Sequence, residues 1–515
     1  MSTPREKLAR SLEALRVIQE EGVIAIRSAD LSREDRETLS RNGFLLEIRK
    51  GWYISANPDA PAGQSAAWHA SYWPFCASYL AWRFGDRWCL SPEASLSLHS
   101  GNRSVPPQLV VRAPKGGNKP TAFPFNASLF DIRAKLPSAS ETVTLEGLRL
   151  YSLPAALIEA SPGFFLHNPD DARIALASIR DASEIGGLLV DGGRSSVAGR
   201  LAGAFRNIGA ESIAEEILDT MRSAGYASRE RNPFETEMGL PMRSESPYAG
   251  RIRLMWNRML DPVMERFPPP PGIPRNIDAY LAHVQDAYVS DACHSLSMEG
   301  YRVSREFVAR VRHREWNPEI HDQDSERSDA LAALGYWQAY RKVLESLGKI
   351  LAGDNPGIVA EQDHGKWFRE MFEPSVSAGI SKRSDHVGYR NGPVYIRGSR
   401  HVPPPREAII DAMQAFFELL AEETSPSVRG VLGHFFFVYV LPYMDGNGRI
   451  GRFLMNVMLG AGGFPWTIVP VETRRKYMTA LEEASVTQDI APFAEMLGAL
   501  VRKALEDRQA NGFAD

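Results

Sequence analysis

The segment Leu441–Arg452 combines residue types that can bind a chain of phosphate groups. Gly446 and Gly448 leave the backbone free to turn its N–H groups toward one point, and the apolar pattern that follows predicts a helix starting there. N–H groups that converge at a helix N-terminus form an anion site. Asn447, between the two glycines, adds a side-chain amide donor. This loop is therefore predicted to bind an anion.

Three charged side chains of the same segment extend this anion site. Arg449 and Arg452 are three residues apart, so both lie near the start of the helix, where their planar guanidinium groups can bind further phosphates. Asp445 places a carboxylate beside those phosphates, in a position suited to hold Mg²⁺. Together these residues predict a site for a nucleotide polyphosphate, and the alternative is a glycine turn with surface arginines.

The twelve residues resemble the signature of the Fic (Fido) family of protein adenylyltransferases, His-Pro-Phe-x-Asp/Glu-Gly-Asn-Gly-Arg-x-x-Arg. Eleven of the twelve positions are filled compatibly, with Tyr443 in place of the Phe. The resemblance implies ATP and Mg²⁺ as ligands, and a target protein whose Ser, Thr or Tyr hydroxyl receives AMP. It also places Leu441, Asp445 and Asn447 at the family's catalytic positions, and the glycines and arginines at its nucleotide-binding positions.

Leu441 stands where the family has a His that removes the proton from the attacking hydroxyl. Leu cannot accept a proton, so general-base catalysis worth roughly 10²–10⁴-fold would be lost. His434 lies seven residues upstream, roughly 10 Å along the same helix, which is too far for a replacement base and favours a packing role. Leu441 is either a natural loss or an introduced change. Two functions stay open: an adenylyltransferase, and a catalytically weakened, nucleotide-binding Fic protein that acts as a DNA-binding regulator or an antitoxin-like sensor.

The segment Ser295–Gly300 fits the inhibitory motif of the same family, Ser/Thr-x-x-x-Glu-Gly/Asn. By this resemblance Ser295, Glu299 and Gly300 belong to an inhibitory helix before the Fic core, and Glu299 pairs with Arg452 in place of a phosphate. A carboxylate and a phosphate compete for one guanidinium because both offer it oxygen atoms. Without the Fic motif this pattern would be weak support, because a Ser and a Glu four residues apart are common.

A short segment before the motif is predicted to form a β-hairpin flap. Val394, Tyr395 and Ile396 resemble the part of the Fic fold that holds a target segment by strand addition. The physical basis is an exposed strand edge that offers backbone hydrogen bonds. The alternative is an ordinary hairpin.

The first 57 residues show the element order of a winged helix-turn-helix domain. Helical spacing, caps and turn residues predict each element in turn. The elements are a helix from Leu8 to Ile18, a strand at Val23–Ile26, a brief helix at Ala29–Leu31, a second helix at Arg33–Arg41, and a hairpin of Phe44–Ile48 and Trp52–Ile54. In such a domain the second short helix enters the major groove of DNA and the hairpin is the wing.

Five basic residues of this domain are candidates for contact with operator DNA, namely Arg33, Arg36 and Arg41 on the helix and Arg49 and Lys50 on the wing. Residues 1–55 carry ten basic and nine acidic side chains, so a small interaction domain with a solvated, charged helix is the alternative. The segments Ala25–Leu31 and Lys50–Ile54 resemble AbiEi-type antitoxins. That resemblance implies a bacterial protein that binds DNA and regulates its own expression.

The chain is thus predicted to be multidomain, with a mixed α/β middle domain and a mainly α C-terminal Fic fold that carries the small β-hairpin flap. The predicted boundaries are 1–57 for the winged helix, 58–226 for the AbiEi-like domain, 227–272 for a linker with a Pro-rich end, and 273–510 for the Fic domain. Strands are expected at Gln108–Arg112 and Leu148–Tyr151, and helices at Asp171–Ile179, Ala198–Phe205 and Ile213–Ala224. The basic loop Lys115–Lys119 could contact phosphate, although a plain surface turn is the favoured interpretation.

Length and composition agree with this organisation. A chain of 515 residues suggests about three domains, and 44% hydrophobic residues allow each to bury a core. Three widely spaced cysteines exclude a disulfide scaffold and predict a reducing, cytoplasmic setting. Neither a secretory signal nor a segment able to span a membrane is visible, so no membrane partner is expected. The net charge of −4 excludes a grossly basic protein, and the oligomeric state stays open, with a homodimer as one candidate.

Overall fold

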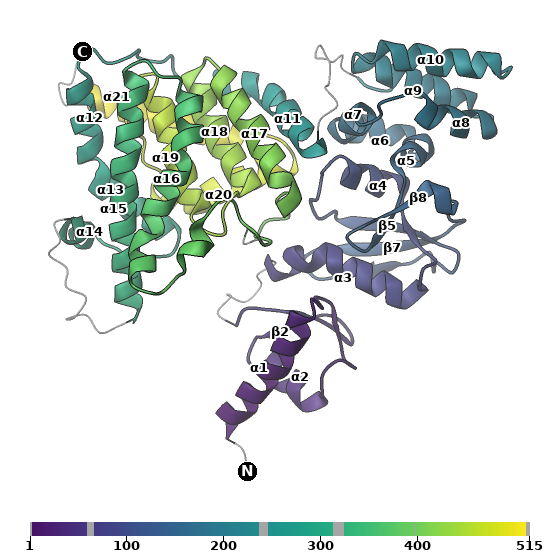
Figure 1. The fold of residues 1–515 in the computed structure, drawn as a ribbon, viewed down its shortest axis with the longest axis horizontal. Helices are drawn as coiled ribbons and strands as arrows, with labels where there is room; N and C mark the ends of the chain where they lie inside the picture. The colour runs from purple at the N-terminus through teal and green to yellow at the C-terminus, as the bar shows by residue number, and fades with distance from the viewer. Residues whose placement is uncertain (1–2, 59–65, 236–245, 313–323, 397, 511–515) are drawn as a thin grey trace. The chain divides into compact units, whose positions relative to one another are not determined.

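The computed structural model describes residues 3–58, 66–235, 246–312, 324–396 and 398–510. The chain divides into two compact units, Met1–Arg251 with Tyr395–Val402, and Ile252–Val394 with Pro403–Asp515. Figure 1 shows that the first unit mixes helices and strands, whereas the second is helical. Within the described residues, no helix is long and apolar enough to cross a membrane.

The first unit begins with a small module that has its own core. Its elements are α1 (Pro4–Glu20), β1 (Ile26–Arg27), α2 (Arg33–Arg41), β2 (Leu45–Arg49) and β3 (Trp52–Ser55). The strands lie in the order β1-β3-β2, and both pairs are antiparallel. Ser32 caps α2 through Asp35 N–H, as its position before the helix predicts.

Two details of this module differ from the prediction. The strand expected at Val23–Ile26 is reduced to Ile26–Arg27, and the brief helix expected at Ala29–Leu31 is a turn. The turn closes because Asp30 accepts the Arg27 N–H on its carboxylate, 2.8 Å, and donates its own N–H to the Arg27 carbonyl. A side chain that bonds the backbone locally in this way competes with helix formation.

A four-stranded sheet with helices forms the rest of the first unit. The sheet has the order β4-β5-β7-β6, with β5 and β7 parallel, and α3 packs its aromatic side chains into the same core as β5 and β7. Figure 1 shows α5 to α10 gathered beyond the sheet. The predicted strands and helices of this region are present. The elements are α3 (Ala66–Phe84), β4 (Cys89–Leu90), α4 (Pro92–His99), β5 (Gln108–Ala113), β6 (Pro120–Ala122), β7 (Ser128–Arg133), β8 (Thr142–Leu145), β9 (Leu148–Tyr151), α5 (Leu153–Glu159), α6 (Pro162–His167), α7 (Pro169–Ala177), α8 (Ser183–Asp191), α9 (Ser195–Asn207) and α10 (Glu211–Ser223).

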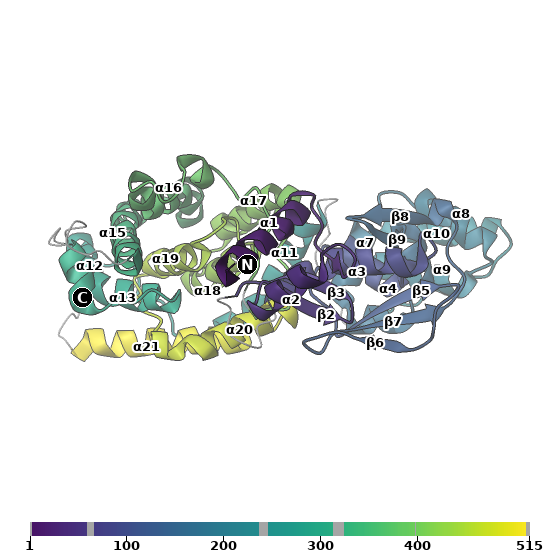
Figure 2. The same cartoon turned by 90° about the horizontal axis from the view of Figure 1, so that it is seen from below.

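The second unit is built from helices, and Figure 2 shows α20 and α21 following one another along one side of it. α11 crosses the stretch predicted as a linker, part of which, 236–245, lies outside the described residues; Trp256 of α11 is buried and stacks on Phe436 at 5.6 Å. The helices are α11 (Pro247–Met264), α12 (Ile277–Asp286), α13 (Tyr288–Met298), α14 (Arg305–Arg312), α15 (Asp324–Leu351), α16 (Pro356–Ser377), α17 (Ile409–Glu422), α18 (Pro426–Val440), α19 (Asn447–Gly460), α20 (Arg474–Val486) and α21 (Ala491–Ala510). α18 and α19 are apolar and buried, and they position the loop that the sequence singles out.

Candidate functional site

The loop between α18 and α19 is entered and left through left-handed residues. Leu441 ends α18 with φ of 47°, and Gly446 precedes α19 with φ of 78°. A side chain at Gly446 is disfavoured for two reasons, because this φ strains other residues and because a Cβ would lie in tight contact, 3.0 Å, with the ring of Phe372. The two conformations reverse the chain within a few residues and aim the N-terminus of α19 at the loop, as the glycines predict.

Asn447 holds the loop closed instead of facing a ligand. Its Oδ1 accepts the Tyr443 N–H at 2.9 Å, and its Nδ2 donates to the Tyr443 carbonyl at 2.7 Å. The side chain is buried, so both amide atoms are already satisfied. The sequence suggested a donor to phosphate, whereas in this geometry Asn447 braces the backbone of the loop at Tyr443.

Asp445 and Arg449 lie together at the mouth of the loop. The Asp445 carboxylate is largely exposed and accepts the Gly446 N–H at 2.6 Å and Arg449 Nη2 at 3.1 Å. The Arg449 guanidinium is buried against the rings of Phe372 and Tyr301, at 5.2 and 5.6 Å. Arg449 Nε has no hydrogen-bond partner. A buried donor without a partner beside an exposed carboxylate fits a site that an anion completes.

These residues also fit a magnesium ion held together with a nucleotide. Among the described residues no group of three or more His, Cys, Asp or Glu side chains could hold a metal by itself. Mg²⁺ is usually bound by one or two carboxylates plus substrate phosphates. The single exposed carboxylate of Asp445 matches the protein ligand that such a site needs.

Arg452 joins the loop to α13, because its guanidinium hydrogen-bonds Ser295 of that helix and Glu299 at its C-terminal cap. Its Nε donates to Ser295 Oγ at 2.9 Å, and its Nη2 donates to the Ser295 carbonyl at 3.1 Å and to Glu299 Oε1 at 2.7 Å. The pair expected from the inhibitory motif is therefore present, although 153 residues separate Glu299 from Arg452. The same Oε1 would lie 2.6 Å from a Cβ built on Gly448. The carboxylate thus occupies the space directly above the glycine loop.

Burial and charge act in opposite directions on this ion pair. Burial alone would raise the pKa of Glu299, but the nearby guanidinium of Arg452 outweighs it and lowers that pKa below its ordinary value. Glu299 is therefore an anion at neutral pH. In electrostatic terms it takes the place that a phosphate oxygen would take beside Arg452.

Arg390 is a part of the site that sequence reasoning missed. Its guanidinium is buried and donates to the carbonyls of Leu441 at 2.7 Å, Gly392 at 3.1 Å and Pro404 at 2.5 Å, and its N–H donates to the Pro442 carbonyl. The first half of the α18–α19 loop is therefore held by a side chain from outside the motif. No signal in a single sequence marks such a residue, because its partners are backbone carbonyls, which every residue carries.

His434 has the packing role that its distance from the motif predicts. Nε2 lies 2.7 Å from the Tyr477 hydroxyl, the ring stacks on Phe493, and a Cβ on Gly451 would meet Nδ1 at 2.8 Å. Burial lowers the pKa of His434 to about 4, so the ring is neutral in the folded chain at neutral pH.

This buried imidazole predicts a pH dependence of stability. Between about pH 6.5 and 4 the unfolded chain binds a proton at His434 that the folded chain refuses, so the free energy of unfolding falls as the pH falls, by at most about 1.4 kcal/mol per pH unit. A His434→Gln variant keeps a polar partner for Tyr477 but does not titrate, and we expect a shallower fall in urea midpoint. His167→Gln, at an exposed His, serves as the control, and equal pH profiles for all three chains would refute the assignment.

The residues described in this region do not form the predicted β-hairpin flap. Val394, Tyr395 and Ile396 adopt no strand, and residue 397 lies outside the described residues. Val394 belongs to the second unit, whereas Tyr395–Val402 belongs to the first, where Arg400 accepts the Val105 N–H at 3.0 Å. Pro393 and the left-handed Gly398 interrupt the regular pairing that two strands need.

Three of the five side chains proposed for DNA contact are used within the first unit. Arg33 pairs with Glu37 at 2.8 Å, Arg36 donates to the backbone carbonyls of Ser28 and Leu31, and the Arg49 guanidinium lies 5.6 Å from the Tyr79 ring. Arg41 and Lys50 are exposed. α2 and the β2–β3 turn are placed as predicted, but the cationic surface that they offer is smaller than the count of residues suggested.

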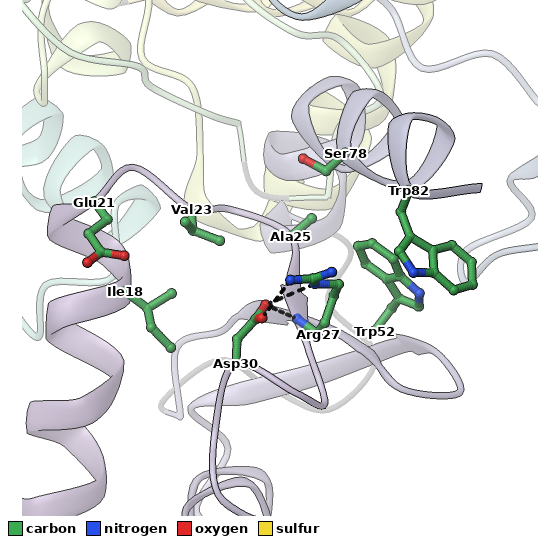
Figure 3. A pocket seen from close by; sticks show the side chains of 9 residues that line it. All are labelled: Ile18, Glu21, Val23, Ala25, Arg27, Asp30, Trp52, Ser78 and Trp82. Atoms are coloured by element: carbon green, nitrogen blue, oxygen red, sulfur yellow. Dashed lines mark hydrogen bonds and ion pairs between the residues drawn. The ribbon is translucent and has the colours of Figure 1, made fainter. Parts of the chain in front are cut away.

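A cavity of about 580 Å³ lies where the small module meets α3, between the end of α1, β1 and the aromatic residues Trp52 and Trp82 (Figure 3). The two indole rings meet edge to face at 5.5 Å, and Arg27 and Asp30, which also line the cavity, form an ion pair at 3.1 Å. Trp82 is largely exposed and Trp52 is buried, so this contact ties the module to the next domain through one residue of each.

Comparison with known proteins supports the reading of the loop. Residues 362–459 match the Fic/DOC family, a range that includes α18, the loop and almost all of α19. Over 122 residues the chain is 37% identical to a protein adenylyltransferase Fic of Drosophila willistoni and 35% identical to that of Drosophila melanogaster. These stretches are 23% of this chain and 24% of each relative, so the chain matches about a quarter of the length of these curated relatives.

Two solved structures show weaker similarity. Fic-1 (residues 134–508) of C. elegans is 18% identical with a TM-score of 0.38, and the match covers 70% of this chain and 89% of that one. A Fic domain containing signaling protein of Bacteroides thetaiotaomicron is 15% identical with a TM-score of 0.33, covering 50% of this chain and 98% of that one.

Proposed function

Since the chain contains a Fic domain, we propose that it binds ATP in the α18–α19 loop and that its transfer of AMP to protein hydroxyls is restricted at two positions, Leu441 and Glu299. The observation that carries this proposal is the contrast within one loop. The elements that bind phosphate are complete, including the braced backbone and Arg449, while the position of the proton acceptor holds an alkyl side chain. A chain that had lost all function would not be expected to keep the phosphate-binding groups and lose only the proton acceptor.

Each residue of the loop has a distinct part in this proposal. The N–H group of Gly448 and the guanidinium of Arg449 bind the phosphates, and Mg²⁺ held by Asp445 would offset their charge. In AMP transfer the hydroxyl oxygen of the target protein forms a bond to the α-phosphorus and pyrophosphate leaves. The hydroxyl proton then needs an acceptor, and Leu441 cannot be one.

Calorimetric titration of the full chain with ATP in the presence of Mg²⁺ tests the binding half of the proposal. We expect saturable binding that weakens at least tenfold in Asp445→Asn, because the metal loses its anionic ligand while the exposed site leaves the fold intact. Asp507→Asn, on the exposed side of α21, is the matched control. If neither the native chain nor a Glu299→Gly variant binds ATP, the hypothesis of an enzyme and the hypothesis of a nucleotide-dependent regulator are both refuted.

A second candidate function is regulation through operator DNA, as an AbiEi-like bacterial repressor. It is favoured by one arrangement, in which α2 precedes the β2–β3 turn that carries Lys50. The full chain is then expected to bind its own promoter with strong salt dependence, and Arg41→Glu with Lys50→Glu is expected to reduce that affinity at least tenfold. Binding that is equal for promoter and random DNA would exclude operator recognition.

A further inference from the structure

A second cavity in the first unit is lined by cations and no acids. It measures about 550 Å³ and is bounded by Arg87, Pro114, Arg133, Ala134, Lys135 and Leu136. Arg87 follows α3, Pro114 ends β5, and the other four residues continue from β7. Three positive side chains thus converge from two separate segments, one with Arg87 and one with Arg133 and Lys135, around one hollow with an apolar floor.

The neighbouring loop Lys115–Lys119 adds charge to the same edge of the sheet. Arg133 Nε donates to the Gly116 carbonyl at 3.3 Å, and a Cβ on Gly116 would lie 2.7 Å from the Arg133 backbone nitrogen. The loop therefore packs directly on the strand that lines the cavity. Lys115 and Lys119 are both exposed at its ends.

A buried carboxylate holds this loop in shape. Asp131 of β7 accepts the Gly117 N–H at 2.6 Å and Arg83 Nη2 at 2.8 Å, and its carbonyl accepts the Asn118 N–H at 2.9 Å. Since these backbone donors are used internally, the loop itself is not a phosphate nest. Its lysines are presented by an ordered scaffold, which is a more specific arrangement than the plain surface turn favoured by the sequence.

The three cations of this cavity have no ion-pair partner among the residues that the structure describes, although Arg133 donates to a backbone carbonyl. Among the ion pairs of the described residues none includes Arg87, Arg133 or Lys135, and the acid influenced by Lys135, Glu141, is already held by Ser138. This differs from α2, where Arg33 is paired. Uncompensated like charges at one edge repel one another, so their proximity favours an external anion.

We propose that the cavity and the Lys115–Lys119 loop bind the phosphodiester backbone of a nucleic acid. The cations are exposed and distributed along an edge, whereas a site for one small anion would enclose it among buried donors. A strand of regularly spaced phosphates can meet the cavity and the loop together. In the small N-terminal module, Arg33, Arg36 and Arg49 already have partners within the first unit. Phosphate contacts made by the cavity would therefore add to the affinity of this unit for nucleic acid.

The test measures binding of the full chain to a 30-base-pair duplex of random sequence as a function of salt. Each neutralised phosphate contributes about −0.9 to the slope of log K against log salt concentration. We expect the variant Arg87→Glu/Arg133→Glu/Lys135→Glu to bind at least tenfold more weakly and with a slope smaller in magnitude by about 2 to 3. Arg180→Glu/Arg229→Glu/Arg231→Glu changes the net charge equally at exposed residues of the same unit and controls for the total charge.

Two results would overturn the proposal. Equal slopes for the cavity variant and its control would show that these cations make no contact with the duplex. The other result would come from a competition experiment with millimolar pyrophosphate. If pyrophosphate binds the native chain and not the cavity variant, and if neither pyrophosphate nor the cavity substitutions change duplex binding, the cavity is a small-anion site. Circular dichroism of both triple variants verifies that the substitutions, all on exposed side chains, leave the fold unchanged.

Discussion

Replacing Leu441 with His is expected to raise the rate of AMP transfer by roughly 10²–10⁴-fold, because the substitution supplies the general base that the loop lacks. The substituted residue keeps its place, since its backbone is held independently of its side chain. The Leu441 N–H donates to the Phe437 carbonyl at 3.1 Å, and the Leu441 carbonyl accepts from Arg390 at 2.7 Å. The imidazole would therefore project from the same point of the loop.

The backbone conformation provides a matched control for this experiment. Leu441 has φ of 47°, in the left-handed region. His, Asn and Asp are several-fold enriched in that region, and a bulky aliphatic side chain is disfavoured there. Leu441→Asn relieves the same strain without adding a base. Any gain shared by the His and Asn variants therefore reports backbone relief, and the gain unique to His reports proton transfer.

The measurement is incorporation of AMP from α-labelled ATP into the chain itself or into added protein, for the native chain and both variants. Adding Asp445→Ala to the His variant is expected to remove the gained activity. If the native chain labels itself as fast as Leu441→His while both bind ATP equally, Leu441 does not restrict the enzyme. If the His and Asn variants are equally fast, the missing base is not the cause.

Replacing Glu299 with Gly is expected to strengthen ATP binding at least tenfold, equivalent to about 1.4 kcal/mol. The carboxylate accepts a hydrogen bond from Arg452 Nη2 at 2.7 Å and lies against Gly448. A phosphate that binds the loop must displace it and must itself compete for the guanidinium. Removing the carboxylate leaves the hydrogen bonds from Arg452 to Ser295 in place and opens the guanidinium to a phosphate oxygen.

The same substitution is expected to lower stability when no nucleotide is present. Arg452 is almost fully buried, and a buried charged donor that loses a partner costs about 1–3 kcal/mol. Since ATP binds the folded chain, it should restore stability in proportion to its concentration over Kd. The ATP-induced rise in Tm should therefore be larger for Glu299→Gly than for the native chain.

Two further substitutions make this experiment decisive. Glu299→Gln keeps the shape and a hydrogen-bonding oxygen but not the charge, and its ATP affinity should lie between those of the native chain and Glu299→Gly. Glu306→Gln removes an equal charge from exposed α14 and should change neither affinity nor Tm appreciably. Equal ATP affinity for all four chains would mean that Glu299 does not compete with nucleotide.

Local patterns predicted the elements of this chain well because caps, turns and periodicity act over a few residues. Ser32 before α2, Asn42-Gly43 after it, and the alternating strand β5 are examples in which the local chemistry alone defines the element. The flap prediction failed because it considered side-chain type alone. Val394, Tyr395 and Ile396 have strand-forming side chains, but Pro393 and the left-handed Gly398 flank them, and a strand also needs a partner with free backbone groups, which depends on tertiary structure.

What the sequence by itself determined is the chemistry of the α18–α19 loop, because two glycines, an amide, two arginines and one acid within twelve residues bring their own geometry. It also determined that a proton acceptor is missing at Leu441. Only the tertiary structure decided how these groups are engaged. Asn447 turns back onto Tyr443, Arg390 reaches in from outside the motif, and Glu299 meets Arg452 across 153 residues. Those contacts depend on which helices pack together, and packing is decided by the whole apolar core and not by any short segment of the chain.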